Sequence, residues 1–287
     1  MGRCGIVKRS VGAALVVALP AFLALLVTPG GPGGARAQSA TTQPATASGG
    51  PVDPALIADL VLANHILANQ GVLDGFGHVS VRHPADPNRF LMSRSIAPAL
   101  VAAEDIMEYD LDANPLDARG RGSFLERFIH SEIYRARPDV GAVIHSHSPG
   151  VIPFGVTGVP MKPIYHMSSF LAPSVPIFEI RKTGGTTNML VGNPQLGKAL
   201  AQALGDRPVA LMRGHGEVVV APKLSLAVFR AIYTEVNARL QAQAVALGGP
   251  IIFLDPEEAA KATQTNEQAH TRAWELWKRD AEEQTAR

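Results

Sequence analysis

The sequence has a single cysteine, Cys4, among its 287 residues. It precedes an apolar segment near the N-terminus, whereas a lipid-anchoring cysteine would follow such a segment. Once this region is removed, the chain has no thiol, no disulfide framework and no thiolate metal site. Any metal ion would therefore have to be held by histidine, aspartate or glutamate.

The sequence also lacks a marked excess of either charge, with 26 basic and 25 acidic residues. It has no basic run with interleaved aromatic residues, the pattern expected of a nucleic-acid-binding surface. Segment 1–37 carries four basic residues and no acidic one, so the remainder has 22 basic and 25 acidic residues, a net charge of −3. We therefore expect no nucleic-acid partner.

The first 37 residues have the features of a cleavable secretory signal peptide. A positively charged segment, 1–9, precedes the apolar stretch 11–27, and Ala35-Arg36-Ala37 is a typical cleavage site. The alternative is a transmembrane anchor, but Pro20 interrupts the apolar stretch, which is shorter than the roughly 20 residues of a spanning helix. We expect cleavage after Ala37, a secreted or periplasmic location and no membrane attachment afterwards.

Composition divides the rest of the chain into three parts. Residues 38–52 are rich in Ala, Thr, Ser, Gly and Pro, which is typical of a disordered linker. Residues 53–248 suit one large domain, and residues 249–287 form a C-terminal helical extension. The chain shows no internal repeat.

The hydrophobic pattern predicts helices and strands that alternate irregularly. Helices are expected at 53–70, 123–135, 149–154, 194–204, 224–247 and 259–281, and strands at 78–83, 89–93, 104–111, 142–147, 209–212 and 217–220. Strands broken by helices at irregular intervals, with hairpins present, favour an α/β protein with a mixed three-layer sandwich over a doubly wound sheet.

The apolar strand 142–147 ends in two histidines, His145 and His147, spaced two residues apart. Side chains two apart on a strand point to the same face, so these imidazoles can converge on one point. Neutral imidazole is a common ligand of first-row divalent metal ions. The alternative is that both are idle, solvated residues at a strand end.

Two further residues could complete a metal site. His215 lies between Gly214 and Gly216, which allow the backbone to approach a neighbouring group closely. Glu126 starts a predicted helix three residues after Ser123, the spacing of a capping box, so taken alone it indicates a helix cap. Three histidines and a carboxylate would form a tetrahedral or octahedral site with open positions for water or substrate.

The chain resembles the class II aldolase/adducin family over about residues 54–248. The resemblance is carried by five motifs, Gly77-His78-Val79-Ser80-Val81-Arg82, Glu126-Arg127-Phe128-Ile129-His130, Arg137-Pro138-Asp139, His145-Ser146-His147 and Gly214-His215-Gly216. It implies a three-layer α/β/α sandwich on a largely antiparallel central sheet. It also implies a homotetramer with active sites at subunit interfaces.

The resemblance assigns roles residue by residue. It implies that His145, His147 and His215 bind one divalent metal ion per subunit (Zn, Mn, Co or Fe) and that Glu126 is the catalytic acid/base. A metal chelated by substrate oxygens acts as a Lewis acid that stabilises the enolate left when a carbon–carbon bond breaks. A neighbouring carboxylate then exchanges a proton with the carbanionic carbon.

Three departures from the family's sugar-phosphate aldolases bear on the substrate. The aldolases carry Gly-Asn where this chain has Gly77-His78, and two phosphate-binding serines where it has Phe124-Leu125. Phenylalanine and leucine donate no hydrogen bond to a phosphate. Near the place of the aldolases' tyrosine acid stands Tyr165-His166, and His166 is expected to face the site, with Tyr165 as a weaker substrate-binding candidate.

These departures resemble the family's decarboxylase branch, which acts on hydroxylated aromatic or pyridine acids. Loss of carbon dioxide would leave a metal-stabilised enolate, and an acid would then protonate the ring carbon. Ser80 and three arginines, Arg82, Arg94 and Arg127, are weaker substrate-binding candidates, since guanidinium pairs bidentately with carboxylate. The expected function is thus a metal-dependent carbon–carbon lyase acting on a small molecule. The alternatives are an aldehyde-lyase for a non-phosphorylated hydroxy compound and a non-catalytic adducin-like binding module.

Overall fold

The computed structural model describes residues 48–285. The signal peptide expected at 1–37 and the linker residues 38–47 lie outside this range. Among the helices between residues 48 and 285, none combines the length and apolar character that crossing a bilayer requires.

A seven-stranded sheet forms the middle of the fold, in the order β3-β2-β1-β4-β7-β6-β5. All neighbouring strands are antiparallel except the pair β5 and β6. The strands are β1 (His78–Arg82), β2 (Arg89–Ser93), β3 (Ile106–Asp110), β4 (Ala142–Ser146), β5 (Ile177–Phe178), β6 (Val209–Met212) and β7 (Gly216–Ala221).

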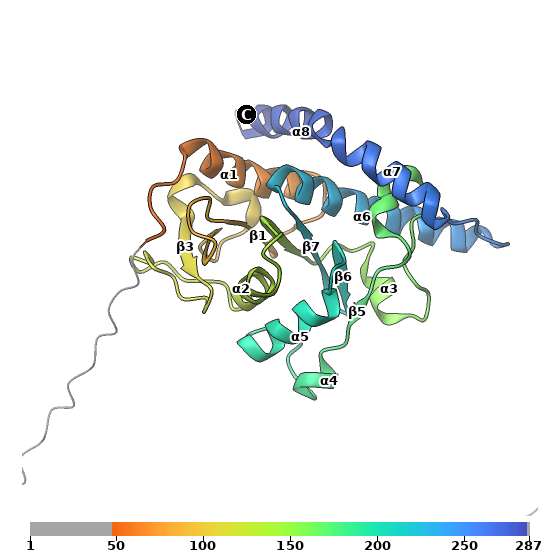
Figure 1. Ribbon diagram of the computed structural model, residues 1–287, viewed down its shortest axis with the longest axis horizontal. Coiled ribbons are helices and arrows are strands. Elements are labelled where there is room, and N and C mark those ends of the chain that lie inside the picture. The colour runs from red at the N-terminus through yellow and green to blue at the C-terminus, as the bar shows by residue number, and fades with distance from the viewer. Residues whose placement is uncertain (1–47, 286–287) are drawn as a thin grey trace, which may run out of the picture. The chain divides into compact units, whose positions relative to one another are not determined.

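Helices cover both faces of the sheet (Figure 1). The longer ones are α1 (Pro54–Asn69), α2 (Arg127–Ala136), α5 (Pro194–Leu204), α6 (Leu224–Leu247), α7 (Pro256–Gln268) and α8 (His270–Thr285). Two short helices, α3 (Ile152–Val156) and α4 (Arg181–Gly184), and three 3-10 turns, η1 (Pro98–Leu100), η2 (Ala103–Asp105) and η3 (His166–Leu171), lie in the connections.

The central strands are apolar on both faces because each face is covered. In β4, Ile144 packs in the core with α1 and α6, whereas its neighbour Val143 packs in the core with α2 and α5. Residues of β7 alternate in the same way. Successive side chains of a strand point to opposite faces, so two helical layers are needed to bury them. The expected three-layer sandwich with a largely antiparallel sheet is confirmed.

Local signals locate most element boundaries well. Asp53 caps α1 by accepting from the Ala55 amide, with Pro54 in the first turn, as the sequence indicates. The prediction for α2 is wrong at its start, because the helix begins at Arg127 and Glu126 makes no side-chain cap. The two-residue β5 and the short α4 are too brief to leave a hydrophobic period, and they were not predicted.

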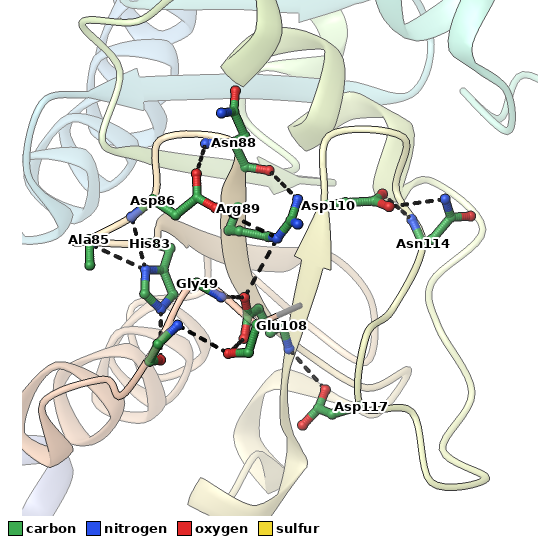
Figure 2. A network of polar contacts seen from close by, with 12 residues as sticks. Gly49, His83, Ala85, Asp86, Asn88, Arg89, Glu108, Asp110, Asn114 and Asp117 are labelled. Carbon is green, nitrogen blue, oxygen red and sulfur yellow. Dashed lines mark hydrogen bonds and ion pairs between the residues drawn. The ribbon is translucent and has the colours of Figure 1, made fainter. Parts of the chain in front are cut away.

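Residues 48–50, at the end of the expected linker, contact the sheet edge. Ser48 Oγ and the Gly49 amide donate to the Glu108 carboxylate on β3 over 2.5 and 2.6 Å, and His83 Nε2 lies 3.2 Å from the Gly50 carbonyl oxygen. Figure 2 shows this network around Glu108. The carboxylate therefore fixes where the chain enters the domain.

The C-terminal helices also pack against the domain. Trp274 and Trp277 of α8 are buried in the core shared with α1 and α6, and Lys278 pairs with Asp59 of α1 over 3.1 Å. The buried faces of α1 and α6 are thus completed by residues after 248.

We predict that Trp274→Ala lowers the free energy of unfolding by about 3–5 kcal/mol, because it removes a buried indole and leaves a cavity. The matched control is Leu276→Ala on the same helix, where the side chain is 47% exposed and the expected change is within about 0.5 kcal/mol. Denaturant unfolding measures both. Equal effects of the two substitutions would show that α8 does not pack on the domain.

Candidate metal centre

The pairing of β4 with β7 orients the first histidine. His145 is fully buried, and its Nδ1 lies 2.9 Å from the carbonyl oxygen of Glu217 on β7. A carbonyl oxygen only accepts, so Nδ1 carries the proton and Nε2 keeps its lone pair. This Nε2 atom is buried and has no hydrogen-bond partner, which leaves a lone pair available to a cation.

His215 is oriented in the same way. Its Nδ1 donates to the Met189 carbonyl oxygen over 3.1 Å, and its Nε2 lies 3.1 Å from Nε2 of His147. The loop that carries it has Gly214 at φ +63°, and a Cβ on Gly216 would lie 2.0 Å from the backbone oxygen of Ser146. The two glycines therefore bring His215 next to the end of β4, as the sequence predicts.

Glu126 reaches the histidines from the start of α2. Its Oε1 accepts from the Val191 amide over 2.8 Å, while Oε2 lies 3.6 Å from His145 Nε2 and 3.4 Å from His215 Nε2. Burial opposes ionisation, but protons on Nε2 of the two histidines outweigh it and hold the pKa of Glu126 below its usual value. A cation bound at the same Nε2 atoms would act in the same direction. The side chain is thus an ionised carboxylate turned into the cluster rather than a helix cap.

The four groups fit a divalent metal ion. One ligand atom from each of Glu126, His145, His147 and His215 lies within 4.8 Å of the other three. Two of the imidazoles are held by backbone carbonyls in the tautomer that presents Nε2, the usual outer support of a metal-binding histidine. Burial lowers the pKa of His147 to about 4, so this ring is neutral and able to bind a metal near pH 7.

A cavity of about 360 Å³ opens onto this cluster. Glu126, His147, His78 and Ser95 supply its polar groups. Its apolar wall consists of Phe76, Ile96, Phe124, Leu125 and Leu190. Among the described residues that line it, none is a lysine or an arginine. The cavity therefore suits a flat apolar ring carrying a few oxygen atoms rather than a phosphate.

The structure places none of the three candidate arginines in this cavity. The Arg82 guanidinium donates to four backbone carbonyl oxygens between residues 87 and 140. Arg94 is paired with Asp105 over 2.6 Å, and Arg127 donates to the carbonyl oxygens of Ala113 and Phe124. Within the single chain, each guanidinium is instead engaged with backbone carbonyl oxygens or with Asp105, and their contact with a substrate carboxylate stays a prediction.

Ser80 and Tyr165 are also absent from the cavity wall. Ser80 is fully buried behind it, and its hydroxyl contacts Tyr134 and His130, so direct substrate contact is excluded. Tyr165 packs beside Tyr233. His166 is exposed at the start of η3, where its backbone oxygen accepts from Asn266 of α7. His166 was expected to face the site, but in the single chain it does not line the cavity.

Two histidines were missed as site residues. His78 lines the cavity, with its ring 4.6 Å from that of Phe124, and its Nδ1 lies 2.6 Å from Nε2 of His130. Burial lowers the pKa of His130 to about 3 and also depresses that of His78. The replacement of the aldolases' asparagine by His78 was the available signal, together with the spacing of His130 and Tyr134, one turn apart on α2.

Comparison with known proteins identifies the family. The sequence model of one protein family, the class II aldolase and adducin N-terminal domain, matches residues 58–242, which is more than half of the chain. The chain therefore belongs to the class II aldolase and adducin family.

Several relatives extend this comparison. The decarboxylase tropJ of Talaromyces stipitatus is 39% identical over 241 residues, covering 76% of this chain and 91% of that protein. A 3,4-dihydroxyphthalate decarboxylase of Arthrobacter keyseri is 33% identical over 217 residues, which cover 70% of this chain and 84% of that protein. Among solved structures, the L-fuculose 1-phosphate aldolase of Glaciozyma antarctica has a TM-score of 0.67 at 25% identity, covering 83% of this chain and 95% of that one. The fold and the sequence thus indicate the same family.

We predict about one divalent metal ion per chain in the purified protein and its loss from a His145→Ala/His147→Ala variant, because two of its three histidine ligands disappear. His65→Ala is the matched control, since His65 bonds the Val101 carbonyl oxygen outside the cluster. Elemental analysis after dialysis measures the number of metal ions bound per chain. An unchanged number in the double variant would show that the ion binds elsewhere.

Proposed function

We propose that this protein is a metal-dependent carbon–carbon lyase that decarboxylates a hydroxylated aromatic acid. The observation that carries the proposal is the apolar cavity without cationic groups that opens directly onto the Glu126 and histidine cluster. The two decarboxylase relatives support the same reaction class.

His145, His147 and His215 would hold the metal ion, and Zn, Mn, Co and Fe all suit such ligands. The ion supplies Lewis acidity that favours negative charge on the substrate oxygens. The apolar wall excludes water and strengthens this electrostatic interaction.

Glu126 moves the proton. As an ionised carboxylate at rest, it accepts a proton from the substrate hydroxyl. Glu126 then gives this proton to the ring carbon that bears the carboxylate, which the electron pair of the deprotonated oxygen makes basic. The bond between this ring carbon and the carboxylate carbon breaks, carbon dioxide leaves, and the electron pair of that bond restores the aromatic ring with the negative charge on the oxygen. The Val191 amide keeps Oε1 in place while Oε2 exchanges the proton.

The cavity wall also ranks the alternatives. Phe124 and Leu125 line it where a sugar-phosphate aldolase needs hydrogen-bond donors, which favours decarboxylation over cleavage of a phosphorylated sugar. An aldehyde-lyase for a non-phosphorylated compound is the second candidate, supported by the aldolase fold neighbours. The complete ligand set counts against a non-catalytic binding module.

We predict that the metal-loaded protein releases carbon dioxide from 3,4-dihydroxyphthalate or a related hydroxylated aromatic acid. Glu126→Gln should retain the metal but lower kcat by about 10²–10⁴, because it cannot carry the proton. Glu132→Gln, another buried glutamate of α2, is the matched control. Carbon dioxide release measures the rate, and full activity of Glu126→Gln would exclude the proton-transfer role. An aldehyde without carbon dioxide would identify the aldehyde-lyase instead.

We also propose that His166 acts in the site of a neighbouring subunit of a homo-oligomer, expected to be a tetramer. His166 is exposed and lies away from its own chain's cavity. The rim of that cavity carries Phe76 and Leu125, which are 68% and 67% exposed in the single chain. A second copy covering this rim would enclose the substrate and bring an additional side chain to it.

A complementation experiment tests this arrangement. Glu126→Gln and His166→Ala chains, each inactive alone, are expected to regain about one quarter of the wild-type activity when co-assembled in equal amounts. Such mixing creates sites with Glu126 from one chain and His166 from another. Activity that stays at the level of the separate variants would show that both residues do not serve one shared site.

A further inference from the structure

Four buried side chains form a continuous line of hydrogen bonds behind the cavity. The Tyr134 hydroxyl lies 2.8 Å from Ser80 Oγ, Ser80 Oγ lies 2.6 Å from His130 Nδ1, and His130 Nε2 lies 2.6 Å from His78 Nδ1. All four are buried, and the proposed reaction uses none of them. The line alternates between α2, which carries Tyr134 and His130, and β1, which carries Ser80 and His78, and it ends with His78 at the cavity wall.

The chemistry of the groups fixes the direction of these bonds. A neutral phenol has one proton to donate, and the side-chain partner of Tyr134 is Ser80. Ser80 Oγ has two side-chain partners, Tyr134 and His130, so once it accepts from Tyr134 its own proton has His130 Nδ1 as its acceptor. His130 must then carry its proton on Nε2 and donate to His78 Nδ1. The reverse direction would leave the buried Tyr134 proton without an acceptor, which is costly.

The direction determines what His78 presents to the cavity. Because Nδ1 accepts from His130, the neutral ring carries its proton on Nε2. The two nitrogens of an imidazole point away from each other, so Nε2 faces away from the buried His130. His78 lines the cavity and its Nδ1 is engaged with His130, so the Nε2–H group is the hydrogen-bond donor that this ring has left for a ligand there.

We infer that His78 is a specificity-determining residue that donates its Nε2–H to an acceptor oxygen of an aromatic acid, and that Tyr134, Ser80 and His130 are positioning residues that fix its tautomer. The inference rests on the proposed function for the identity of the ligand. The tautomer itself follows from the hydrogen-bond line alone.

A neutral donor suits the loss of a carboxylate. An arginine would stabilise the carboxylate of the bound substrate most strongly before the reaction, when the negative charge is still localised there. Binding that is stronger in the ground state than in the transition state raises the barrier. A neutral N–H group orients the oxygen with less of this penalty, and the side chain in ring contact with His78 is the apolar Phe124.

The tautomers are tested directly by nitrogen-15 NMR of the zinc-loaded mature protein labelled at its histidines. Both His78 and His130 are expected to carry the proton on Nε2. Tyr134→Phe removes the phenolic proton and should give mixed tautomers at both rings without loss of zinc. Tyr109→Phe is the matched control, because Tyr109 is also buried but bonds Ser123, outside the line. A proton on Nδ1 of His78 in the wild-type protein overturns the inference.

The contact with a ligand is tested by calorimetry with 3,4-dihydroxybenzoate as the probe. His78→Phe keeps a ring but loses the donor, and should weaken binding at least about tenfold, as expected for a hydrogen bond to a charged oxygen. His78→Gln places an amide N–H near the position of Nε2 and should stay within about threefold of the wild type. Equal affinity of His78→Phe and wild type, with metal content unchanged, overturns the contact.

The two proposals fail in different ways. If no hydroxylated aromatic acid releases carbon dioxide although both histidines have the expected tautomer, the proposed function is wrong and the hydrogen-bond line stands. If carbon dioxide is released but His78 carries its proton on Nδ1, the inference fails and the proposed function stands.

Discussion

The antiparallel pairing of β4 with β7 is the contact on which the site depends. It places Ser146 opposite Glu217, so that His145 donates to the Glu217 carbonyl oxygen within the ladder itself. The same register brings the residue after β4, His147, next to the residue before β7, His215. The backbone pairing thus places three imidazoles at the same end of two neighbouring strands. A shift of the β4–β7 register by one residue would turn His145 to the other face of the sheet.

The cluster gathers groups that would be unfavourable to bury separately. A buried carboxylate without a counter-charge costs several kcal/mol, and a buried imidazole nitrogen without a partner also loses hydration. Glu126 Oε2 faces His145 Nε2 at 3.6 Å, and this buried nitrogen has no hydrogen-bond partner. A cation between the two groups would compensate these costs, and metal binding would then be coupled to the stability of this end of the sheet.

The sequence predicted that His145, His147 and His215 converge, because the signals for this arrangement are local. The spacing of His145 and His147 on a strand and the two glycines around His215 each determine geometry over three residues. The positions of the three arginines outside the cavity have the opposite cause. A long guanidinium side chain finds carbonyl oxygens in distant loops, as Arg82 does at Val140 and Pro87, and no local pattern specifies that choice.

Glu126 and His78 illustrate the same limit. Glu126 has the spacing of a capping box, but the Val191 amide and two histidines, all distant in sequence, compete for its carboxylate and prevail. His78 was noted only as a departure from the aldolase pattern. Its partner His130 comes from α2, more than 50 residues away, so its orientation depends on how the helix packs on the sheet.

The proposed metal site and the cavity wall opposite it are held in different ways. At the proposed metal site, His145, His215 and Glu126 are oriented largely by backbone atoms, since Glu217 and Met189 supply carbonyl oxygens and Val191 supplies an amide. The opposite wall consists of side chains, with Phe124 and His78 in ring contact at 4.6 Å. Side-chain replacements there change the substrate without disturbing the ligands, because backbone support does not depend on which side chains are present. The departures from the sugar-phosphate aldolases lie in this second wall, as expected if the metal chemistry is retained and the substrate is different.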